Sequence, residues 1–264
     1  MKTSKEFKNE GFVMSNLTQM TVEQMKQMKM ELTRFMMAYR FALDEMNTKI
    51  NILKDEFTYI HEYNPIEHSC SRVKSPESLF NKVMRKDIPF TLESIRENIL
   101  DIAGIRITCS FRSDIYRIKD MLLNQKDIET VEVKDYIENP KPNGYQSLHL
   151  IVKVPVFMSD REEKVPVEIQ IRTIAMDFWA SLEHKIYYKY DKAVPNNLVN
   201  ELKEAADVAT ALDYKMERLH NEVSIFKEKQ SEEELTTLNI QDGQFTLPMK
   251  FLESFAFEQD KEEE

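Results

Sequence analysis

Three stretches of this chain alternate apolar and polar residues one by one, which is the pattern of a β-strand with one buried face. In the stretch 167–172, the polar side chains of Glu168, Gln170 and Arg172 share one face. The stretches 105–110 and 146–151 repeat this pattern, and their polar faces carry Arg106, Thr108, Ser147 and His149. A sheet with one solvent-facing side explains the alternation. It does not explain this choice of ionisable and hydrogen-bonding residues.

Segments with helical periodicity lie on both sides of these strands. The patterns predict strands at 105–111, 130–136, 146–154 and 165–171, and helices at 75–86, 91–100, 114–124, 174–190 and 198–223, behind a long N-terminal helix. This order predicts an α+β fold, an α/β layer arrangement in which helices flank a mixed sheet and long helices stand at both ends.

The long N-terminal helix is predicted to begin at Thr21, because Thr21 and Gln24 match a capping box. An apolar stripe follows in steps of three and four residues: Met25, Met28, Leu32, Phe35, Tyr39, Ala42 and Met46. We interpret this stripe as part of the core, with packing against a partner as the alternative. Asn64 and Pro65 end the helical pattern.

Composition divides the chain into three parts. Residues 1–20 show no periodicity and are expected to be a disordered extension, in which Met14 is an alternative start. Residues 21–224 form the predicted domain with its flanking helices. Residues 225–264 hold 11 acidic and 4 basic residues, which accounts for −7 of the net charge of −10. We expect a mobile acidic tail, and a body able to bind an anion.

The two cysteines and the hydropathy limit the classes of protein. Two cysteines in 264 residues do not make a disulfide framework. Cys109 continues an apolar strand face and is expected to be a buried free thiol. We find neither a signal-peptide pattern nor an apolar run long enough to span a membrane. The chain is therefore expected to be cytoplasmic, with no membrane partner.

Cations are dense around the helix predicted at 75–86, where Ser75 and Pro76 form its start. Five of them lie within 15 residues: Arg72, Lys74, Lys82, Arg85 and Lys86. Ser78, Lys82 and Arg85 share one side of the helix. A solvated basic face is the plain interpretation. A polyphosphate site is the other, because Arg, Lys and a helix N-terminus all favour phosphate oxygens.

Single residues elsewhere have two interpretations each. Asp101, at the entrance to a strand, suits Mg²⁺ beside phosphates or a local backbone contact. Tyr145, after Gly144, suits stacking on a base or ordinary burial. Trp179 is expected in the core. Glu183 and His184 on the same helix are further candidate site residues, and a structural histidine is the alternative for His184.

Taken in order, these motifs resemble the synthetase domain of the RelA/SpoT family. The resemblance covers about residues 40–220 and is greatest to its small alarmone synthetases, the RelP type more than the RelQ type. It rests on Ser71–Lys74, Ser78 with Lys82, Asp101–Arg106, Gly144–His149, Glu168–Thr173 and Trp179–His184, together with 64–68 and 141–145. Each motif is modest alone, but six in this order make a specific signal.

The resemblance implies a nucleotidyltransferase-like sheet and transfer of the β,γ-pyrophosphate of ATP to the 3′-hydroxyl of GDP or GTP. It implies that Arg72 and Arg106 sandwich adenine and that Lys74, Ser78, Lys82, Arg85 and Lys86 hold the ATP phosphates. Asp101 and Glu168 would bind Mg²⁺, and Glu168 would act on the attacking hydroxyl. The implied acceptor residues are Tyr145, His149, Gln170, Arg172, Lys141 and Asn143.

The resemblance also sets limits. Gln146 stands where many relatives carry Arg, so a phosphate contact there is not carried over. None of the five histidines precedes an Asp, so the His-Asp pair of the long enzymes' hydrolase domain is missing. We expect synthesis without hydrolysis, no ribosome-binding domain, and a homotetramer formed through the terminal helices.

Two other functions fit some of these features. A nucleotidyltransferase acting on RNA ends would also use basic residues and a stacking tyrosine. The basic cluster, however, is compact enough for one triphosphate rather than a long backbone, so we expect no nucleic-acid partner. A non-catalytic nucleotide- or RNA-binding regulator is the second alternative, and retention of both Asp101 and Glu168 argues against it.

Overall fold

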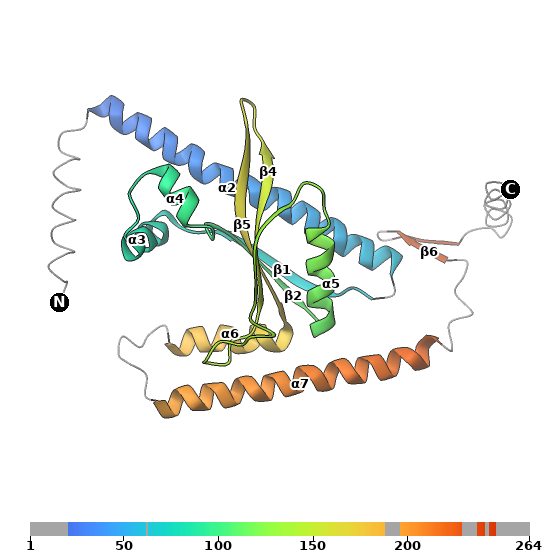
Figure 1. Ribbon diagram of the computed structural model, residues 1–264. Helices are drawn as coiled ribbons and strands as arrows, with labels where there is room; N and C mark the ends of the chain where they lie inside the picture. The colour runs from blue at the N-terminus through green and yellow to red at the C-terminus, as the bar shows by residue number, and fades with distance from the viewer. Residues whose placement is uncertain (1–20, 62, 188–195, 229–236, 241–242, 247–264) are drawn as a thin grey trace.

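The computed structural model describes residues 21–61, 63–187, 196–228, 237–240 and 243–246 (Figure 1). Its centre is a five-stranded sheet in the order β1-β2-β5-β4-β3. The strands are β1 (Ile66–Val73), β2 (Ala103–Cys109), β3 (Glu129–Asp135), β4 (Leu148–Phe157) and β5 (Glu162–Thr173). β2 and β5 pair in parallel and the other pairs are antiparallel, so the predicted mixed sheet is confirmed.

Six helices accompany this sheet in the described residues. They are α2 (Val22–Ile60), α3 (Pro76–Lys86), α4 (Leu92–Asn98), α5 (Arg112–Leu123), α6 (Ile174–Tyr187) and α7 (Asn196–Glu228). The predicted caps are present, since the Thr21 side chain accepts from Gln24 N and the Ser75 side chain accepts from Ser78 N. None of the helices in this part of the chain is long and apolar enough to span a bilayer.

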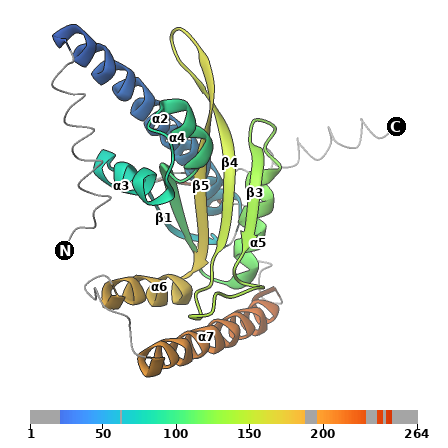
Figure 2. The same cartoon turned by 60° about the vertical axis from the view of Figure 1, so that its left-hand side comes forward.

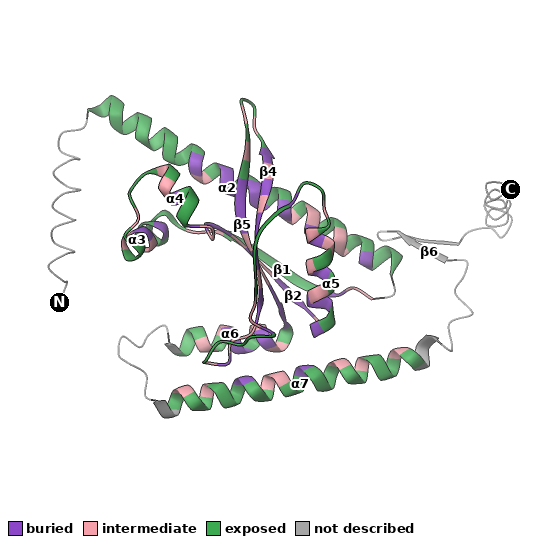
Figure 3. Ribbon diagram, in the orientation of Figure 1, coloured by how far each residue is buried: buried purple, intermediate pink, exposed green. Residues whose placement is uncertain are grey.

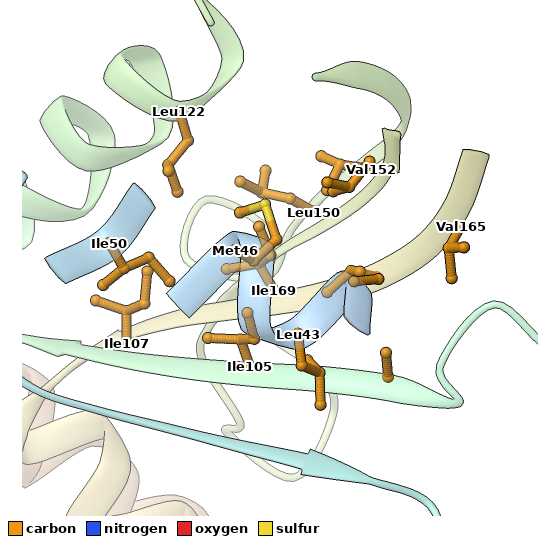
Figure 4. Close-up of a cluster of buried hydrophobic side chains, with 14 of the residues drawn as sticks. Leu43, Met46, Ile50, Ile105, Ile107, Leu122, Leu150, Val152, Val165 and Ile169 are labelled. Carbon is orange, nitrogen blue, oxygen red and sulfur yellow. The ribbon is translucent and has the colours of Figure 1, made fainter. Parts of the chain in front are cut away.

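The apolar face of the sheet packs against α2 and α5 to form the core. Met46 and Ile50 of α2 meet Ile107 and Ile169 of the central strands, and Leu122 of α5 closes the cluster from one side (Figure 4). All of these side chains are almost fully buried. Cys109 is buried in the same core as a free thiol, as expected. Burial at this density makes the sheet a rigid support for its other face.

These two helices do not cover the polar face of the sheet, where Arg106, Glu168 and Gln170 are only partly buried. The first turns of α2 and most of α7 are exposed (Figure 3). α3 and α4 lie towards one edge of the sheet, and α6 and α7 lie together across one end (Figure 2). Trp179 of α6 is buried, as predicted, and its indole N–H donates to Leu202 O of α7 at 2.9 Å. The open face is therefore bordered by helices on two sides.

The first turns of α2 contradict one prediction. Phe35, Tyr39, Ala42 and Met46 of the apolar stripe are buried. The earlier members of the stripe, Met25, Met28 and Leu32, are 41–48% exposed. The N-terminal part of α2 extends past the sheet (Figure 1), so the described part of the chain offers these residues no core to pack against.

Two more segments differ from the sequence prediction. β1 was not predicted, because most of its residues are exposed and polar and its burial does not alternate. The region after Ile225 was predicted to be irregular, yet α7 continues to Glu228, and β6 (Thr237–Ile240) pairs with β7 (Gly243–Thr246). The predicted extension 1–20 and the remaining tail lie outside the described residues.

Candidate active site

A cavity of about 200 Å³ opens on the polar face of the sheet beside β1, β2 and β5. Six of the predicted site residues contribute to its walls: Arg72, Lys74, Asp101, Arg106, Glu168 and Gln170. They come from three separate segments, which the strand order brings together. The cavity therefore combines cations and carboxylates in one place, as an anionic substrate with a metal ion requires.

Gly104 keeps the middle of this cavity free of side chains. The strand register places Arg72 opposite Gly104 on one side and Glu168 opposite Gly104 on the other. A methyl group at Gly104 would meet no other atom closer than Arg72 O at 4.0 Å. The space above Gly104 is therefore open for a ligand rather than needed by the protein's own packing.

Asp101 is the centre of charge in this cavity. Its Oδ2 accepts from Lys74 Nζ at 3.1 Å and from Lys82 Nζ at 2.5 Å. Burial raises the pKa of Asp101, but the two lysines outweigh it and the pKa lies below its ordinary value. The other oxygen, Oδ1, is buried and has no hydrogen-bond partner. Asp101 is thus ionised, with one oxygen left to bind something further.

The other residues predicted to bind the ATP phosphates do not all reach the cavity. Ser78 lies in the first turn of α3, where its hydroxyl accepts from Ser75 Oγ at 2.9 Å. Lys86 donates to Asn98 O at 3.2 Å and so joins the end of α3 to the end of α4. Arg85 lies beside it in the last turn, outside the cavity walls.

Five predicted site residues form a closed ring of polar contacts on the same face. Gln170 donates to Glu168 Oε2 (3.0 Å) and accepts from Arg172 (2.8 Å). Arg172 also donates to Tyr145 Oη (2.6 Å), which contacts His149 Nε2 (2.8 Å). His149 Nδ1 lies 3.4 Å from Glu168 Oε1 and closes the ring. Each of these side chains therefore fixes the orientation of the next.

The direction of the hydrogen bonds in the ring follows from Arg172. A guanidinium can only donate, so Tyr145 Oη accepts from Arg172 and has its own hydrogen for His149 Nε2. A neutral imidazole that accepts at Nε2 carries its proton on Nδ1, which then donates to Glu168. Both oxygens of Glu168 are thereby hydrogen-bonded by neutral donors.

The contacts of Glu168 keep its carboxylate charged. Burial raises its pKa, but the contact with His149 and the hydrogen bond from Gln170 act in the other direction. The net result is a pKa below the ordinary value of glutamate. Glu168 and Asp101 are thus two ionised carboxylates lining one cavity.

Tyr145 is held by the loop that precedes β4. Gly144 has a φ of 87°, a left-handed conformation that favours glycine, and a methyl group there would lie 2.5 Å from Ala206 Cβ of α7. Asn143 accepts from Tyr145 N and donates to Glu183 of α6 (3.2 Å each). Lys141 Nζ lies 4.6 Å from the Tyr145 ring centroid. The loop is thus anchored to both α6 and α7.

Two residues at this site were not predicted. Tyr136 packs edge-on against His149 with ring centroids 5.1 Å apart, and Lys141 Nζ lies 4.6 Å from its ring centroid. Asp177, in the first turn of α6, contacts Arg106 and Arg172. A tyrosine at the end of a predicted strand and an aspartate in a predicted helix are both common. Neither indicates a site until strand pairing and helix packing place it beside the other site residues. His184, a predicted candidate, lies in the last turn of α6.

An open sheet face with a cationic cavity beside two ionised carboxylates is the arrangement of an enzyme that works on phosphorylated substrates. The family model described as a region found in RelA/SpoT proteins matches residues 71–193. GTP pyrophosphokinase YwaC of Bacillus subtilis is 56% identical over 188 residues, which is 71% of this chain and 90% of the relative. The chain therefore belongs to the RelA/SpoT family, among its small alarmone synthetases.

Other relatives and solved structures agree with this assignment. GTP pyrophosphokinase YjbM of the same bacterium is 41% identical over 190 residues, 72% of this chain and 89% of the relative. The crystal structure of small alarmone synthetase 2 from Bacillus subtilis has a TM-score of 0.67 and 53% identity, covering 73% of this chain and 99% of that one. Small alarmone synthetase 1, bound to its product pppGpp, has a TM-score of 0.69 and 39% identity, covering 74% and 98%.

Proposed function

We propose that this protein is a GTP pyrophosphokinase, which transfers the β,γ-pyrophosphate of ATP to the 3′-hydroxyl of GDP or GTP and so makes ppGpp or pppGpp. The observation that carries the proposal is the pairing of the cavity around Asp101 with the ring around Tyr145. Glu168 and Gln170 belong to both. A donor and an acceptor nucleotide bound on this face would meet at Glu168.

The donor half is the cavity. Arg72 and Arg106 are proposed to hold the adenine between their planar guanidinium groups. Lys74 and Lys82, which now share Asp101, are proposed to bind the phosphates, assisted by Ser78 at the start of α3. Arg85 and Lys86 extend the positive charge along the last turn of that helix.

The acceptor half is the ring and the loop before β4. The Tyr145 ring is proposed to stack on guanine, because its hydroxyl is fixed by Arg172 and His149. Lys141 and Asn143 lie beside it on the loop and are proposed to bind acceptor phosphates. His149, Gln170 and Arg172 line the sheet beneath and hold Tyr145 and Glu168 in register.

The residues present fit a magnesium ion. Mg²⁺ binds through one or two carboxylates together with substrate phosphates. Asp101 has a buried carboxylate oxygen without a partner, and Glu168 lines the same cavity. In the described residues no three His, Cys, Asp or Glu side chains gather as a metal cage, which suits an ion completed by phosphate oxygens. Bound there, the ion would neutralise charge on the polyphosphate.

The chain's own part in the reaction is positioning and proton transfer. Glu168 is ionised, is held by two hydrogen bonds, and is proposed to accept the proton of the 3′-hydroxyl as that oxygen attacks phosphorus. The cations around Asp101 stabilise the charge that develops on the transferred group. The rigid sheet keeps donor and acceptor aligned.

A labelling experiment tests the reaction. The protein is incubated with Mg²⁺, GDP or GTP, and ATP labelled at the γ-phosphate, beside the variant Glu168→Gln. We expect label in a more highly phosphorylated guanosine nucleotide with AMP as co-product, and loss of about 100-fold or more in the variant. No transfer by a folded protein that binds GTP would instead favour a non-catalytic regulator.

A second assay tests the absence of hydrolysis. No histidine in the chain is followed by Asp, so we propose that the protein only synthesises alarmones. Incubation with ppGpp and Mn²⁺ should release no pyrophosphate, and its release would overturn this part of the proposal. ATP and guanosine nucleotides as substrates also fit the proposed cytoplasmic location.

The protein is further proposed to form a homotetramer. Helices α2, α6 and α7 expose apolar side chains at regular spacing, for example Ile174, Phe178, Leu182 and Ile186 along α6. Apolar stripes of this kind are unfavourable in water and are typical of subunit contacts. Light scattering at micromolar concentration should give a mass well above that of one chain, and a monomer would contradict the proposal.

A further inference from the structure

One carboxylate contacts arginines from both halves of the site. Asp177 Oδ1 lies 3.2 Å from Arg106 Nη1 and 3.1 Å from Arg172 Nη1. Arg106 lines the cavity of the donor half. Arg172 belongs to the ring that holds Tyr145 in the acceptor half. Because both contacts use the same oxygen, a movement of Asp177 displaces both guanidinium groups.

Arg172 needs this carboxylate more than a surface arginine would. Its side chain is only 5% exposed. Its other hydrogen-bond partners, Ser147, Gln170 and Tyr145, are all neutral. Asp177 is the one carboxylate that the described part of the chain pairs with it. Loss of that charge would leave a buried cation without a counterion, which is strongly unfavourable.

Within the described residues, Arg106 is held from one side, by Asp177. Its side chain is 36% exposed towards the cavity, and its Nε is buried with no hydrogen-bond partner. Asp177 is therefore the contact that sets the direction of its guanidinium. A planar group that must lie flat against a base depends on such a contact, since an arginine side chain is otherwise flexible.

The backbone makes Asp177 a fixed point. α6 begins at Ile174, directly after β5 ends at Thr173, with no connecting loop. Asp177 stands in the first turn of α6, so its position follows from the sheet itself. Thr173 Oγ1 accepts from Met176 N at 3.1 Å and fixes this turn.

We propose that Asp177 is a positioning residue that aligns the donor-side Arg106 with the acceptor-side Arg172 and Tyr145, so that both nucleotides bind in register. The inference rests on the proposed function for the identity of the two nucleotides. Asp177 itself touches neither reacting group. It acts through the two arginines, and its loss should therefore weaken the binding of both substrates together.

The test uses the variants Asp177→Asn and Asp177→Glu in the whole protein. Dissociation constants for a non-hydrolysable ATP analogue and for GDP are measured separately by calorimetry, together with KM for each substrate. Asparagine should weaken both nucleotides by about tenfold, the factor expected for a lost charge-assisted hydrogen bond. Glutamate, which keeps the charge, should restore part of both affinities.

A matched control separates positioning from stability. Ile118→Val removes one buried methyl group from the packing of α5 in the main core, a cluster that contains neither the two arginines nor Tyr145. It should lower the melting temperature yet leave both dissociation constants within about twofold. A change in only one nucleotide's affinity in Asp177→Asn, or an equal loss in Ile118→Val, overturns the inference. Because binding is measured apart from transfer, absence of turnover in the unaltered protein would count against the proposed function alone.

Discussion

At the scale of single residues, the two glycines near the site have opposite roles. Gly144 has a left-handed backbone and lies against Ala206. Gly104 has an ordinary backbone and open space above it. The first is required by the protein's packing, and the second leaves room for a ligand. Substitution by alanine separates these roles, because it adds the same methyl group at both positions.

Gly144→Ala should destabilise the fold. The methyl group would strain the left-handed backbone and approach Ala206 Cβ to 2.5 Å. We expect the free energy of unfolding to fall by about 2 kcal/mol or more. Urea denaturation followed by circular dichroism measures this loss. An unchanged midpoint would show that the loop does not depend on this contact.

Gly104→Ala should leave stability nearly unchanged and reduce activity. The new methyl group meets no packed atom, so the free energy of unfolding should stay within about 0.5 kcal/mol. The same group projects into the cavity between Arg72 and Glu168, and KM for ATP should rise by about tenfold or more. Steady-state kinetics at saturating GTP measures it. An unchanged KM would place the donor nucleotide elsewhere.

His149→Ala should move the acidic limb of the pH–activity profile to higher pH. In the intact protein, His149 and Gln170 outweigh burial, and the pKa of Glu168 lies below its ordinary value. Without His149 the burial remains and the pKa of Glu168 rises. Glu168 acts as a base only when ionised, so activity should begin to fall at a higher pH than in the parent.

The measurement is kcat/KM for the acceptor between pH 4.5 and 8, in the range where both proteins stay folded. Tyr145→Phe is the control, because it keeps the imidazole beside Glu168 but removes the hydroxyl that contacts Nε2. An acidic limb that lies at the same pH in His149→Ala and the parent would refute the assignment.

At the scale of elements, α2 has two different halves. Its second half packs on the sheet through residues such as Ala42 and Met46, which are fully buried. Its first turns expose Met25 and Met28. The core therefore does not need those first turns, and their apolar stripe is available for a second copy of the chain.

The double variant Met25→Lys with Met28→Lys should lower the oligomeric mass without lowering protomer stability. Both residues are more than 40% exposed, so charge there costs the single chain little. In a buried subunit contact, the same charges would be strongly unfavourable. Light scattering measures the mass, and Glu23→Lys, in the first turn of the same helix, controls for added charge. An unchanged mass would exclude this stripe from the interface.

At the scale of the whole molecule, we expect the catalytic body to end with α7. The relatives match 71–72% of this chain but 89–90% of their own lengths, so this protein carries sequence that they do not share. Within the described residues, the contacts of the candidate site lie between Cys70 and Ala206. We therefore expect the acidic sequence after Glu228 to be dispensable for the site.

Deletion of residues 229–264 should leave catalysis intact. We expect kcat and both KM values within about twofold of the full chain, because α7 and all of its contacts with the sheet side are retained. The labelling assay measures it at equal protein concentration. A large loss of activity would show that the tail takes part in the reaction or in assembly.

The sequence alone determined the kinds of elements and their faces. Alternation at 105–110 and 167–172 predicted strands whose polar sides would carry Arg106, Glu168, Gln170 and Arg172, because side chains in a strand alternate strictly between two faces. The caps at Thr21 and Ser75 were predicted from local hydrogen bonding and are confirmed. The order of the motifs along the chain was enough to indicate the family.

Only the tertiary structure decided which of these residues meet. Strand order is set by long-range packing, so the sequence did not show that Asp101 is shared by Lys74 and Lys82 or that the ring closes through His149. β1 was missed because an exposed edge strand need not alternate. Asp177 was missed because no local pattern shows that strand pairing and the direction of α6 bring it next to Arg106 and Arg172. The physical reason is the same throughout: local pattern reports which face a side chain takes, and packing between distant segments decides what lies opposite it.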